Sequence, residues 1–243
     1  MTQSLQGKTA WITGAGTGIG EASALALAAA GASVVLSGRR REPLDSVAGR
    51  VQANGGEALV MPGDMSDARA VAEIAGAIGQ RGRLDILFSN AGTNIPRRRW
   101  DELTPESIAS LVNANLNAAL YVASACLPLM RKDGGLMIHT GSWAAHFISA
   151  GPGGVYTAAK SAVVAMSHTI NLEENVNNIR SCVLSPGDVH TPLMNQRPMA
   201  ISAEMRAKML TPADVADIVL YLAGLPDRVC INEVIVGPTR AGG

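Results

Sequence analysis

Tyr156 and Lys160 lie four residues apart in a segment with helical periodicity, so the expected helix carries both side chains on one face. A phenol can give a proton to the alkoxide that forms when a ketone is reduced, and a phenolate can take it back when an alcohol is oxidised. The pKa of an unperturbed phenol is about 10, so a nearby cation such as a lysine is needed to stabilise the phenolate near neutral pH. The pair therefore predicts acid and base chemistry on an alcohol or a ketone.

Ser142 follows an expected strand and precedes this pair by a short glycine-rich segment. Its hydroxyl can hold the carbonyl or alcohol oxygen on which Tyr156 acts. Each residue also has an ordinary interpretation, because a tyrosine can be a packing residue and a lysine a solvated helix charge. The combination of these residues with the glycine turn described next favours the catalytic interpretation.

A glycine-rich turn occupies residues 13–20, which read T-G-A-G-T-G-I-G and stand between an expected strand and an alanine-rich helix. Glycine permits a tight turn, lets the backbone approach a pyrophosphate, and lets the helix pack close to the sheet with its positive end toward the phosphates. The turn predicts a dinucleotide site, although a glycine turn by itself is also compatible with a turn that binds no ligand.

Short apolar runs alternate with segments of helical periodicity along the whole chain. The expected strands are 9–13, 33–37, 58–61, 84–88, 136–140, 180–184 and 234–236. The expected helices are 18–30, 42–53, 67–80, 105–131, 154–175 and 212–223. Thr104, Ser66 and Thr211 are expected to cap three of them. The pattern predicts an α/β fold, a doubly wound parallel sheet of about seven strands with helices on both faces.

The chain is expected to form a single domain over residues 1–243, because its length suits one α/β core and no linker or internal repeat interrupts it. Its least regular part, residues 187–209, is rich in Pro and Met. This segment is the expected substrate lid.

The spacing T-G-x-x-x-G-x-G resembles the turn of the short-chain dehydrogenases/reductases, in their compact single-domain branch. Further residues match that family in the same order along the chain: Asp64, the run Ser89 to Gly92, Asn115, Ser142, Tyr156 with Lys160, and Pro186 with Gly187. The resemblance implies a Rossmann-type fold and an NAD(P)-dependent enzyme that interconverts a secondary alcohol and a ketone.

The resemblance also implies roles for the catalytic residues. Tyr156 is the acid and base, Ser142 orients the carbonyl, and Lys160 tunes Tyr156 and bonds the nicotinamide ribose. Asn115 anchors a water molecule through which protons reach solvent.

Other matched positions are expected to hold the cofactor. The resemblance implies that Asp64 accepts a hydrogen bond from the adenine amino group, and that Asn90 and Gly92 let the fourth strand pass close to the adenosine. Val189 and Thr191 are implied to contact the nicotinamide carboxamide. Asp64 and Thr191 also fit ordinary helix-capping residues. The whole expected cofactor set is Gly14, Thr17, Gly18, Ile19, Gly20, Arg39, Asp64, Asn90, Gly92, Tyr156, Lys160, Pro186, Gly187, Val189 and Thr191.

The end of the second expected strand favours NADP(H) over NAD(H). An acidic residue at this point of a dinucleotide fold binds the ribose hydroxyls of NAD, and here the position is Gly38. Arg39 follows, and its guanidinium can meet a 2′-phosphate through two charge-assisted hydrogen bonds, with Ser37 as a further donor. Against this, the glycine turn has no second basic residue, and Arg39 also fits the charged start of a helix.

Composition argues against several other classes of protein. The chain has 20 basic and 20 acidic residues, so nothing in its net charge points to a nucleic acid or an anionic membrane. The N-terminus has no signal-peptide pattern, and the longest apolar run, 24–36, is too short to span a bilayer, which favours a cytoplasmic protein. Cys126, Cys182 and Cys230 are expected to be reduced core thiols. The spacing of the histidines and cysteines favours no metal site.

A run of three arginines, Arg97 to Arg99, has two interpretations. It fits a solvated loop, and it also fits a loop from which one arginine meets an acidic substrate, because it leads from the fourth strand toward the cleft. Trp143 and His146 either line the substrate pocket or pack in the core. Small and apolar residues on more than one face of helices 105–131 and 154–175 predict a homodimer or homotetramer.

Two rival functions remain for this fold. A non-catalytic dinucleotide-binding sensor would need none of Ser142, Tyr156 and Lys160. A sugar-nucleotide epimerase or dehydratase resembles longer chains with an added substrate domain, for which the roughly 50 residues after Gly187 leave little room. The C-terminal stretch looks nearer to the branch that acts on 3-hydroxy acids than to 3-oxoacyl reductases, and a resemblance of this kind does not identify the substrate.

Overall fold

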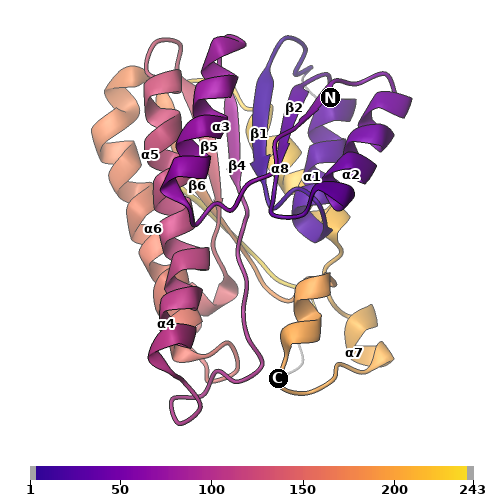
Figure 1. Ribbon diagram of the computed structural model, residues 1–243, viewed down its shortest axis with the longest axis vertical. Coiled ribbons are helices and arrows are strands. Elements are labelled where there is room, and N and C mark those ends of the chain that lie inside the picture. The colour runs from indigo at the N-terminus through magenta and orange to yellow at the C-terminus, as the bar shows by residue number, and fades with distance from the viewer. Residues whose placement is uncertain (1–3, 240–243) are drawn as a thin grey trace.

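The core of the protein is a parallel sheet of seven strands with helices on both faces, in a computed structural model that describes residues 4–239 (Figure 1). The strands lie in the order β3-β2-β1-β4-β5-β6-β7. Their bounds are Thr9–Thr13 (β1), Ser33–Ser37 (β2), Ala58–Val60 (β3), Ile86–Ser89 (β4), Gly135–Thr140 (β5), Ile179–Pro186 (β6) and Glu233–Val236 (β7). The helices are Gly18–Ala29 (α1), Arg41–Ala53 (α2), Ala68–Gln80 (α3), Pro105–Val112 (α4), Ala118–Met130 (α5), Gly154–Glu174 (α6), Ala203–Ala207 (α7) and Pro212–Ala223 (α8). The predicted doubly wound sheet in a single domain is confirmed.

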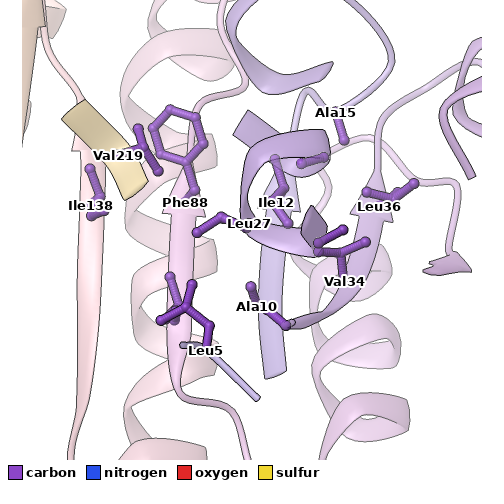
Figure 2. Packing of buried hydrophobic residues seen from close by; sticks show 14 of the residues in the cluster. Leu5, Ala10, Ile12, Ala15, Leu27, Val34, Leu36, Phe88, Ile138 and Val219 are labelled. Atoms are coloured by element: carbon purple, nitrogen blue, oxygen red, sulfur yellow. The ribbon is translucent and has the colours of Figure 1, made fainter. Parts of the chain in front are cut away.

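One face of the sheet is covered by α1, α2 and α8. Ile12 of β1, Phe88 of β4 and Ile138 of β5 are neighbours in register. Figure 2 shows them with Leu27 of α1 and Val219 of α8, and all five side chains are buried in one cluster. Because side chains alternate along a strand, the intervening residues must be buried on the other face.

The opposite face is covered by α3, α5 and α6. Trp11, Leu87 and Met137 are the register neighbours one position earlier on β1, β4 and β5, and none of them is exposed. They belong to a second cluster with Ile78 of α3 and Val122 of α5. Burial on both faces explains why the strands are continuous apolar runs.

The long helix predicted over residues 105–131 is interrupted. The structure has α4, then a π-helical turn at Asn113–Asn117, then α5. The backbone N–H of Ala118 donates to the carbonyl of Asn113, five residues back, so the turn holds one residue more than an α-helical turn.

Two of the three predicted helix caps are confirmed and one is wrong. The hydroxyls of Thr104 and Thr211 each accept a hydrogen bond from the backbone three residues on. At α3 the cap is Asp67, whose carboxylate accepts from the backbone N–H groups two and three residues on at 2.9 and 3.5 Å. Ser66 instead donates its hydroxyl to Asp64 at 2.7 Å, because the helix begins one residue later than predicted.

The prediction of core thiols holds for two of the three cysteines. Cys126 and Cys182 are buried and free, and burial raises the pKa of the Cys182 thiol to about 12. Cys230 is free but exposed, so its prediction as a core residue is wrong. It lies in the segment between α8 and β7 and belongs to neither of the two buried clusters.

Taken together, α4, the π-helical turn and α5 form one helical segment, Pro105–Met130, that is long and apolar enough to cross a membrane by length and composition alone. A helix that packs in the core of a water-soluble protein passes the same test. Leu111, Val122, Cys126 and Met130 of this segment are buried within the fold.

The segment predicted as a lid, residues 187–209, contains two short helical elements that were not predicted, a 3₁₀ turn at Pro192–Gln196 and α7. Its two ends are joined, because Leu210 donates its N–H to the carbonyl of Asp188 at 2.9 Å and accepts one from His190 at 2.8 Å. Figure 1 shows α7 at the same end of the molecule as α4. That this segment moves as a lid stays a prediction.

Candidate active site

A cleft of about 1430 Å³ is lined by the segments that follow the carboxyl ends of the strands. The strand order reverses between β1 and β4, and ligands of open α/β sheets bind outside the carboxyl ends at such a point. The cleft is larger than the roughly 300–1,000 Å³ of most small-molecule pockets, so it has room for a cofactor and a substrate together. The residues predicted from the sequence that line it are Gly14, Thr17, Gly18, Ile19, Arg39, Asp64, Asn90, Gly92, Asn115, Ser142, Tyr156, Lys160, Pro186, Gly187, Val189 and Thr191.

The glycine turn leads from β1 into α1 with its backbone toward the cleft. Gly14 and Gly18 have φ values of +64° and +59°, a region that favours glycine. Gly20 does not line the cleft, but a Cβ there would lie 2.2 Å from the carbonyl oxygen of Gly14. Thr17, at the N-cap of α1, forms no side-chain cap hydrogen bond. The turn therefore presents the positive end of α1, as a phosphate site requires.

Asn90 joins the carboxyl ends of three strands. Its backbone N–H donates to the hydroxyl of Thr13 at 2.9 Å, and its Nδ2 donates to the carbonyl of Thr13 at 3.3 Å. Its Oδ1 accepts from the hydroxyl of Thr140 at 3.1 Å. The side chain of Asn90 thus fixes β1, β4 and β5 relative to one another.

Asn115 lies in the π-helical turn, where only 2% of it is exposed. Its Nδ2 donates to the carbonyl of Thr93 at 2.8 Å and its Oδ1 accepts from the N–H of Thr93 at 3.1 Å. A Cβ at Gly92 would lie 2.8 Å from Oδ1 of Asn115 and 3.4 Å from Nζ of Lys160. Gly92 therefore lies at the Lys160 end of the cleft, where its missing side chain lets these two groups approach.

Tyr156, in the first turn of α6, lies half-buried in the cleft with Ser142 and Lys160. Burial raises the pKa of the Tyr156 phenol, while the hydroxyl of Ser142 and the guanidinium of Arg98 act in the opposite direction. Lys160 has its Nζ 5.8 Å from the centre of the Tyr156 ring and donates to the carbonyl of Thr140 at 2.8 Å. The predicted lowering of the pKa of Tyr156 by Lys160 stays a prediction.

The buried ammonium group of Lys160 lowers the stability of the folded protein. It is 4% exposed, and burial lowers the pKa of its ammonium group to about 8. The hydrogen bond to Thr140 holds the ammonium group beside the end of β5. The chain therefore keeps a buried cation beside Tyr156 at the expense of stability.

Asp64 and Arg39, two of the residues predicted to contact the adenosine part of the cofactor, line the cleft where the chain leaves β3 and β2. Asp64 is exposed, and its carboxylate accepts from the backbone and hydroxyl of Ser66, so it is not the cap of α3. Arg39 is exposed and lines the cleft beside Gly38. The prediction that Ser37 is a further donor to a phosphate is wrong, because Ser37 is fully buried and its hydroxyl accepts from the indole N–H of Trp11 at 2.9 Å.

The segment after β6 closes the cleft from the other side. Gly187 donates its N–H to the carbonyl of Val236 at 2.7 Å, and Val189 forms an isolated bridge with Leu210. A Cβ at Gly18 would lie 3.0 Å from Cγ2 of Thr191, so Thr191 lies over the start of α1. The Thr191 side chain forms no cap hydrogen bond to the 3₁₀ turn that it precedes, which argues against its interpretation as an ordinary cap.

For Trp143, His146 and the three arginines 97–99 the sequence left two interpretations open, and the structure distinguishes them. Trp143 lines the cleft and stacks on Phe147, with ring centres 4.3 Å apart. His146 is directed elsewhere, with Nε2 2.8 Å from a carboxylate oxygen of Glu233. Arg98 is buried in the cleft wall, whereas Arg97 and Arg99 on either side are exposed. These three arginines could not be distinguished from local sequence patterns, because they are identical neighbours in one loop.

Within residues 4–239, no three His, Cys, Asp or Glu side chains gather in a way that could hold a metal ion. The prediction that the protein has no metal site stays a prediction.

The sequence matches the family model described as short chain dehydrogenase over residues 8–201. The chain belongs to the short-chain dehydrogenase family. An uncharacterized oxidoreductase of Listeria monocytogenes is 32% identical over 248 residues, which cover 97% of this chain and 98% of the relative. The protein is therefore an oxidoreductase of this family, and the predicted resemblance is confirmed.

Solved structures of the family superpose over nearly the whole chain. An alcohol dehydrogenase from the archaeon Thermococcus sibiricus, complexed with 5-hydroxy-NADP, has a TM-score of 0.87 at 30% identity, with 97% of this chain and 98% of that one covered. A 7α-hydroxysteroid dehydrogenase, complexed with NADH and 7-oxo glycochenodeoxycholic acid, has a TM-score of 0.88 at 27% identity, with 97% and 94% covered. The short-chain dehydrogenase fold thus extends over both the cleft and the segment 187–209.

The first test concerns the glycine turn. We expect Gly20→Ala to weaken binding of NADP(H) and NAD(H) by at least about tenfold, because its Cβ would overlap the carbonyl of Gly14 and displace the turn. Isothermal titration of each dinucleotide measures the effect. The matched control is Gly76→Ala in α3, where a Cβ meets nothing within 4 Å; it should leave binding unchanged and raise stability by about 1 kcal/mol. A folded Gly20→Ala protein with normal dinucleotide affinity would contradict the assignment of the turn.

Proposed function

We propose that the protein interconverts a secondary alcohol and a ketone, with NADP(H) preferred to NAD(H) as cofactor. The observation that carries the proposal is the convergence of Ser142, Tyr156 and buried Lys160 in one cleft that also contains the glycine turn. A bound nicotinamide would supply the hydride acceptor or donor, which none of these side chains can replace.

The residues present fit a dinucleotide. The left-handed backbone at Gly14 and Gly18 and the space that a Cβ at Gly20 would fill form a cradle at the N-terminus of α1, where a pyrophosphate is favoured. Arg39 and Arg40 line the far end of the same cleft. These features support a phosphate-rich ligand that runs from the end of β2 toward Tyr156.

The proton chemistry belongs to Tyr156. In ketone reduction its phenol gives a proton from Oη to the oxygen that gains negative charge, and in alcohol oxidation the phenolate takes that proton back. The hydroxyl of Ser142 holds the same oxygen and thereby orients the reacting carbon. The ammonium of Lys160 favours the phenolate, and Asn115 holds the water through which the proton exchanges with solvent.

The two rival functions fit the chain less well. A sensor that only binds a dinucleotide needs no proton donor, so Tyr156 and Ser142 in one cleft with the costly buried cation of Lys160 would serve no purpose in it. An epimerase with an added substrate domain is disfavoured, because the chain aligns with 98% of the length of an oxidoreductase relative.

The preference for NADP(H) rests on position 38. Gly38 lines the cleft at the end of β2, so no carboxylate stands there to repel a 2′-phosphate, and the exposed guanidinium of Arg39 follows. The solved relatives include both cofactors, since the Thermococcus enzyme was complexed with 5-hydroxy-NADP and the 7α-hydroxysteroid dehydrogenase with NADH. The preference of this chain for NADP(H) or NAD(H) therefore has to be argued from its own residues at the end of β2.

We further propose a homodimer or homotetramer in the cytoplasm. Ile108 of α4, Leu120 of α5 and Leu172 of α6 are exposed apolar side chains on the helices predicted to form an interface. A two-fold contact between such helices would remove this surface from water.

The catalytic role of Tyr156 is tested by Tyr156→Phe. Turnover should fall by at least about two to three orders of magnitude while dinucleotide binding stays within about twofold, because only the acid and base is removed. Since burial raises the pKa of Tyr156 above the ordinary value of about 10, the phenolate fraction, and with it kcat/KM of the wild type for alcohol oxidation, should keep rising with pH up to and beyond about pH 10. Tyr221→Phe, on an exposed face of α8, is the matched control. Near-normal turnover of Tyr156→Phe would remove Tyr156 from the mechanism.

Lys160→Met should weaken both turnover and dinucleotide affinity, yet stabilise the ligand-free protein. The difference between a pKa of 10.5 and one of about 8 corresponds to about 3 kcal/mol, the cost of the buried ammonium. At pH 7 the lysine is charged in both states, so the folded protein carries this cost. As the pH rises from about 8 to about 10.5, the lysine of the folded protein is neutral while that of the unfolded chain is still charged, so the free energy of unfolding of the wild type increases. The free energy of unfolding of Lys160→Met should not show this increase.

Urea unfolding of wild type and Lys160→Met from about pH 7 to about pH 10.5 measures the effect, with the exposed Lys132→Met as control. A loss of stability at pH 7 together with unchanged dinucleotide affinity would make Lys160 an ordinary structural residue.

Arg39→Ala tests the cofactor preference. We expect the wild type to have the higher kcat/KM with NADP(H), and the variant to lose about 10- to 100-fold with NADP(H) and little with NAD(H), the scale of one or two hydrogen bonds to a charged group. Arg41→Ala is the matched control, because Arg41 pairs with Asp45 on α2 and does not line the cleft. Equal or better use of NAD(H) by the wild type would contradict the preference.

A further inference from the structure

Arg98 is a buried cation in the wall of the cleft that the proposed mechanism does not use. It is 7% exposed and lines the cleft together with Tyr156. Against the larger effect of burial, the charge of Arg98 lowers the pKa of the Tyr156 phenol, and Tyr156 raises the pKa of Arg98, so the two groups interact electrostatically.

The position of Arg98 is fixed by the turn that begins α6. Gly153 has a φ of +86°, and a Cβ there would lie 2.9 Å from the carbonyl oxygen and 3.0 Å from the Cβ of Arg98. Asn94, earlier in the same loop, donates its Nδ2 to the carbonyl of Pro152 at 2.9 Å. The loop that carries Arg98 is therefore packed directly against the turn that leads to Tyr156.

The guanidinium of Arg98 is poorly paired. Its Nη2 donates to the carbonyl of Gln196 at 3.0 Å, and its Nε is buried without a hydrogen-bond partner. Within residues 4–239 it forms no ion pair, whereas Arg99 pairs with Asp101 and Arg197 pairs with Asp188. Burial and the nearby Arg197 both lower the pKa of Arg98, which means that its charge is held at a cost.

A buried charge is normally paired or hydrogen-bonded throughout, because an unpaired one loses its hydration without compensation. A guanidinium has five donors in a fixed fork that matches the two oxygens of a carboxylate. The charge balance favours a carboxylate over a phosphate monoester, since Arg197 is already neutralised by Asp188 and Lys208 forms an ion pair with Glu204. The guanidinium of Arg98, which has no such partner among the described residues, is left to meet one negative charge on a ligand.

We propose that Arg98 binds a carboxylate group of the substrate, so that the preferred substrates are small hydroxy acids and the corresponding oxo acids. This inference rests on the proposed function, since Tyr156 would exchange its proton with the alcohol or ketone of the same molecule. Arg98 is here a specificity-determining residue and takes no part in the proton transfer.

The test compares acids with their methyl esters. The probes are 2-, 3- and 4-hydroxy acids of three to five carbons, each with its ester, and kcat/KM for oxidation is measured with the preferred cofactor. We expect the wild type to prefer the best acid over its ester, and Arg98→Met to lose at least about 100-fold on that acid with little change on the ester. Arg97→Met, an exposed neighbour of the same type, should leave both unchanged.

A second measurement separates binding from turnover. In a Tyr156→Phe background with cofactor present, isothermal titration should detect the best acid, and the added Arg98→Met change should weaken its affinity by a similar factor. Arg98→Lys keeps the positive charge but loses the planar guanidinium that can donate two parallel hydrogen bonds to a carboxylate. This variant should retain part of the preference for the acid over its ester.

An equal loss on acid and ester in Arg98→Met would overturn the inference, because it would mean that Arg98 only fastens the segment 187–209 through Gln196. The inference alone also fails if neutral alcohols are oxidised in a Tyr156-dependent reaction while no acid is preferred to its ester. Failure of the wild type to oxidise any acid, ester or neutral secondary alcohol would instead contradict the proposed function itself.

Discussion

The hydrogen bonds between Thr13, Asn90 and Thr140 join the carboxyl ends of β1, β4 and β5, and both halves of the cleft depend on them. Thr13 is the last residue before the glycine turn, and the carbonyl of Thr140 accepts the hydrogen bond from Lys160. A short chain of polar contacts therefore connects the proposed phosphate site with Lys160, the cation beside the proposed proton donor. Parallel strands whose ends were free to shift would not hold these two sites at a fixed separation.

Much of the fold could be predicted because its signals are local. Apolar runs bounded by glycine and polar residues gave all seven strands to within about two residues, and the alternation with helices implied the parallel sheet. The π-helical turn at Asn113–Asn117 could not be predicted, since it depends on contacts of Asn115 with the loop after β4. The cap of α3 was misplaced by one residue, because Ser66 and Asp67 are both good capping residues and only their surroundings distinguish them.

The residues of the site also fall into two groups, those that local sequence patterns predict and those whose environment depends on contacts between distant segments. The glycine turn and the spacing of Tyr156 and Lys160 are local patterns, and the structure brings them into one cleft. The burial of Ser37 under Trp11 is a contact between neighbouring strands and left no trace in the local sequence. The same holds for Arg98, whose burial depends on Gly153, more than 50 residues away along the chain. Arg97, Arg98 and Arg99 are identical in the sequence, and only the folded structure buries one of them and leaves the other two exposed.

Arg98 reaches the segment 187–209 through the main-chain carbonyl of Gln196. Every amino acid that could occupy position 196 provides that carbonyl, so the contact does not depend on which side chain is present there. Met194 and Met199 line the cleft from the same segment, and their replacement would alter the space around a substrate without removing the acceptor of Arg98. Substitutions at these two positions can therefore change which substrates this protein accepts, one at a time, while the guanidinium keeps its place.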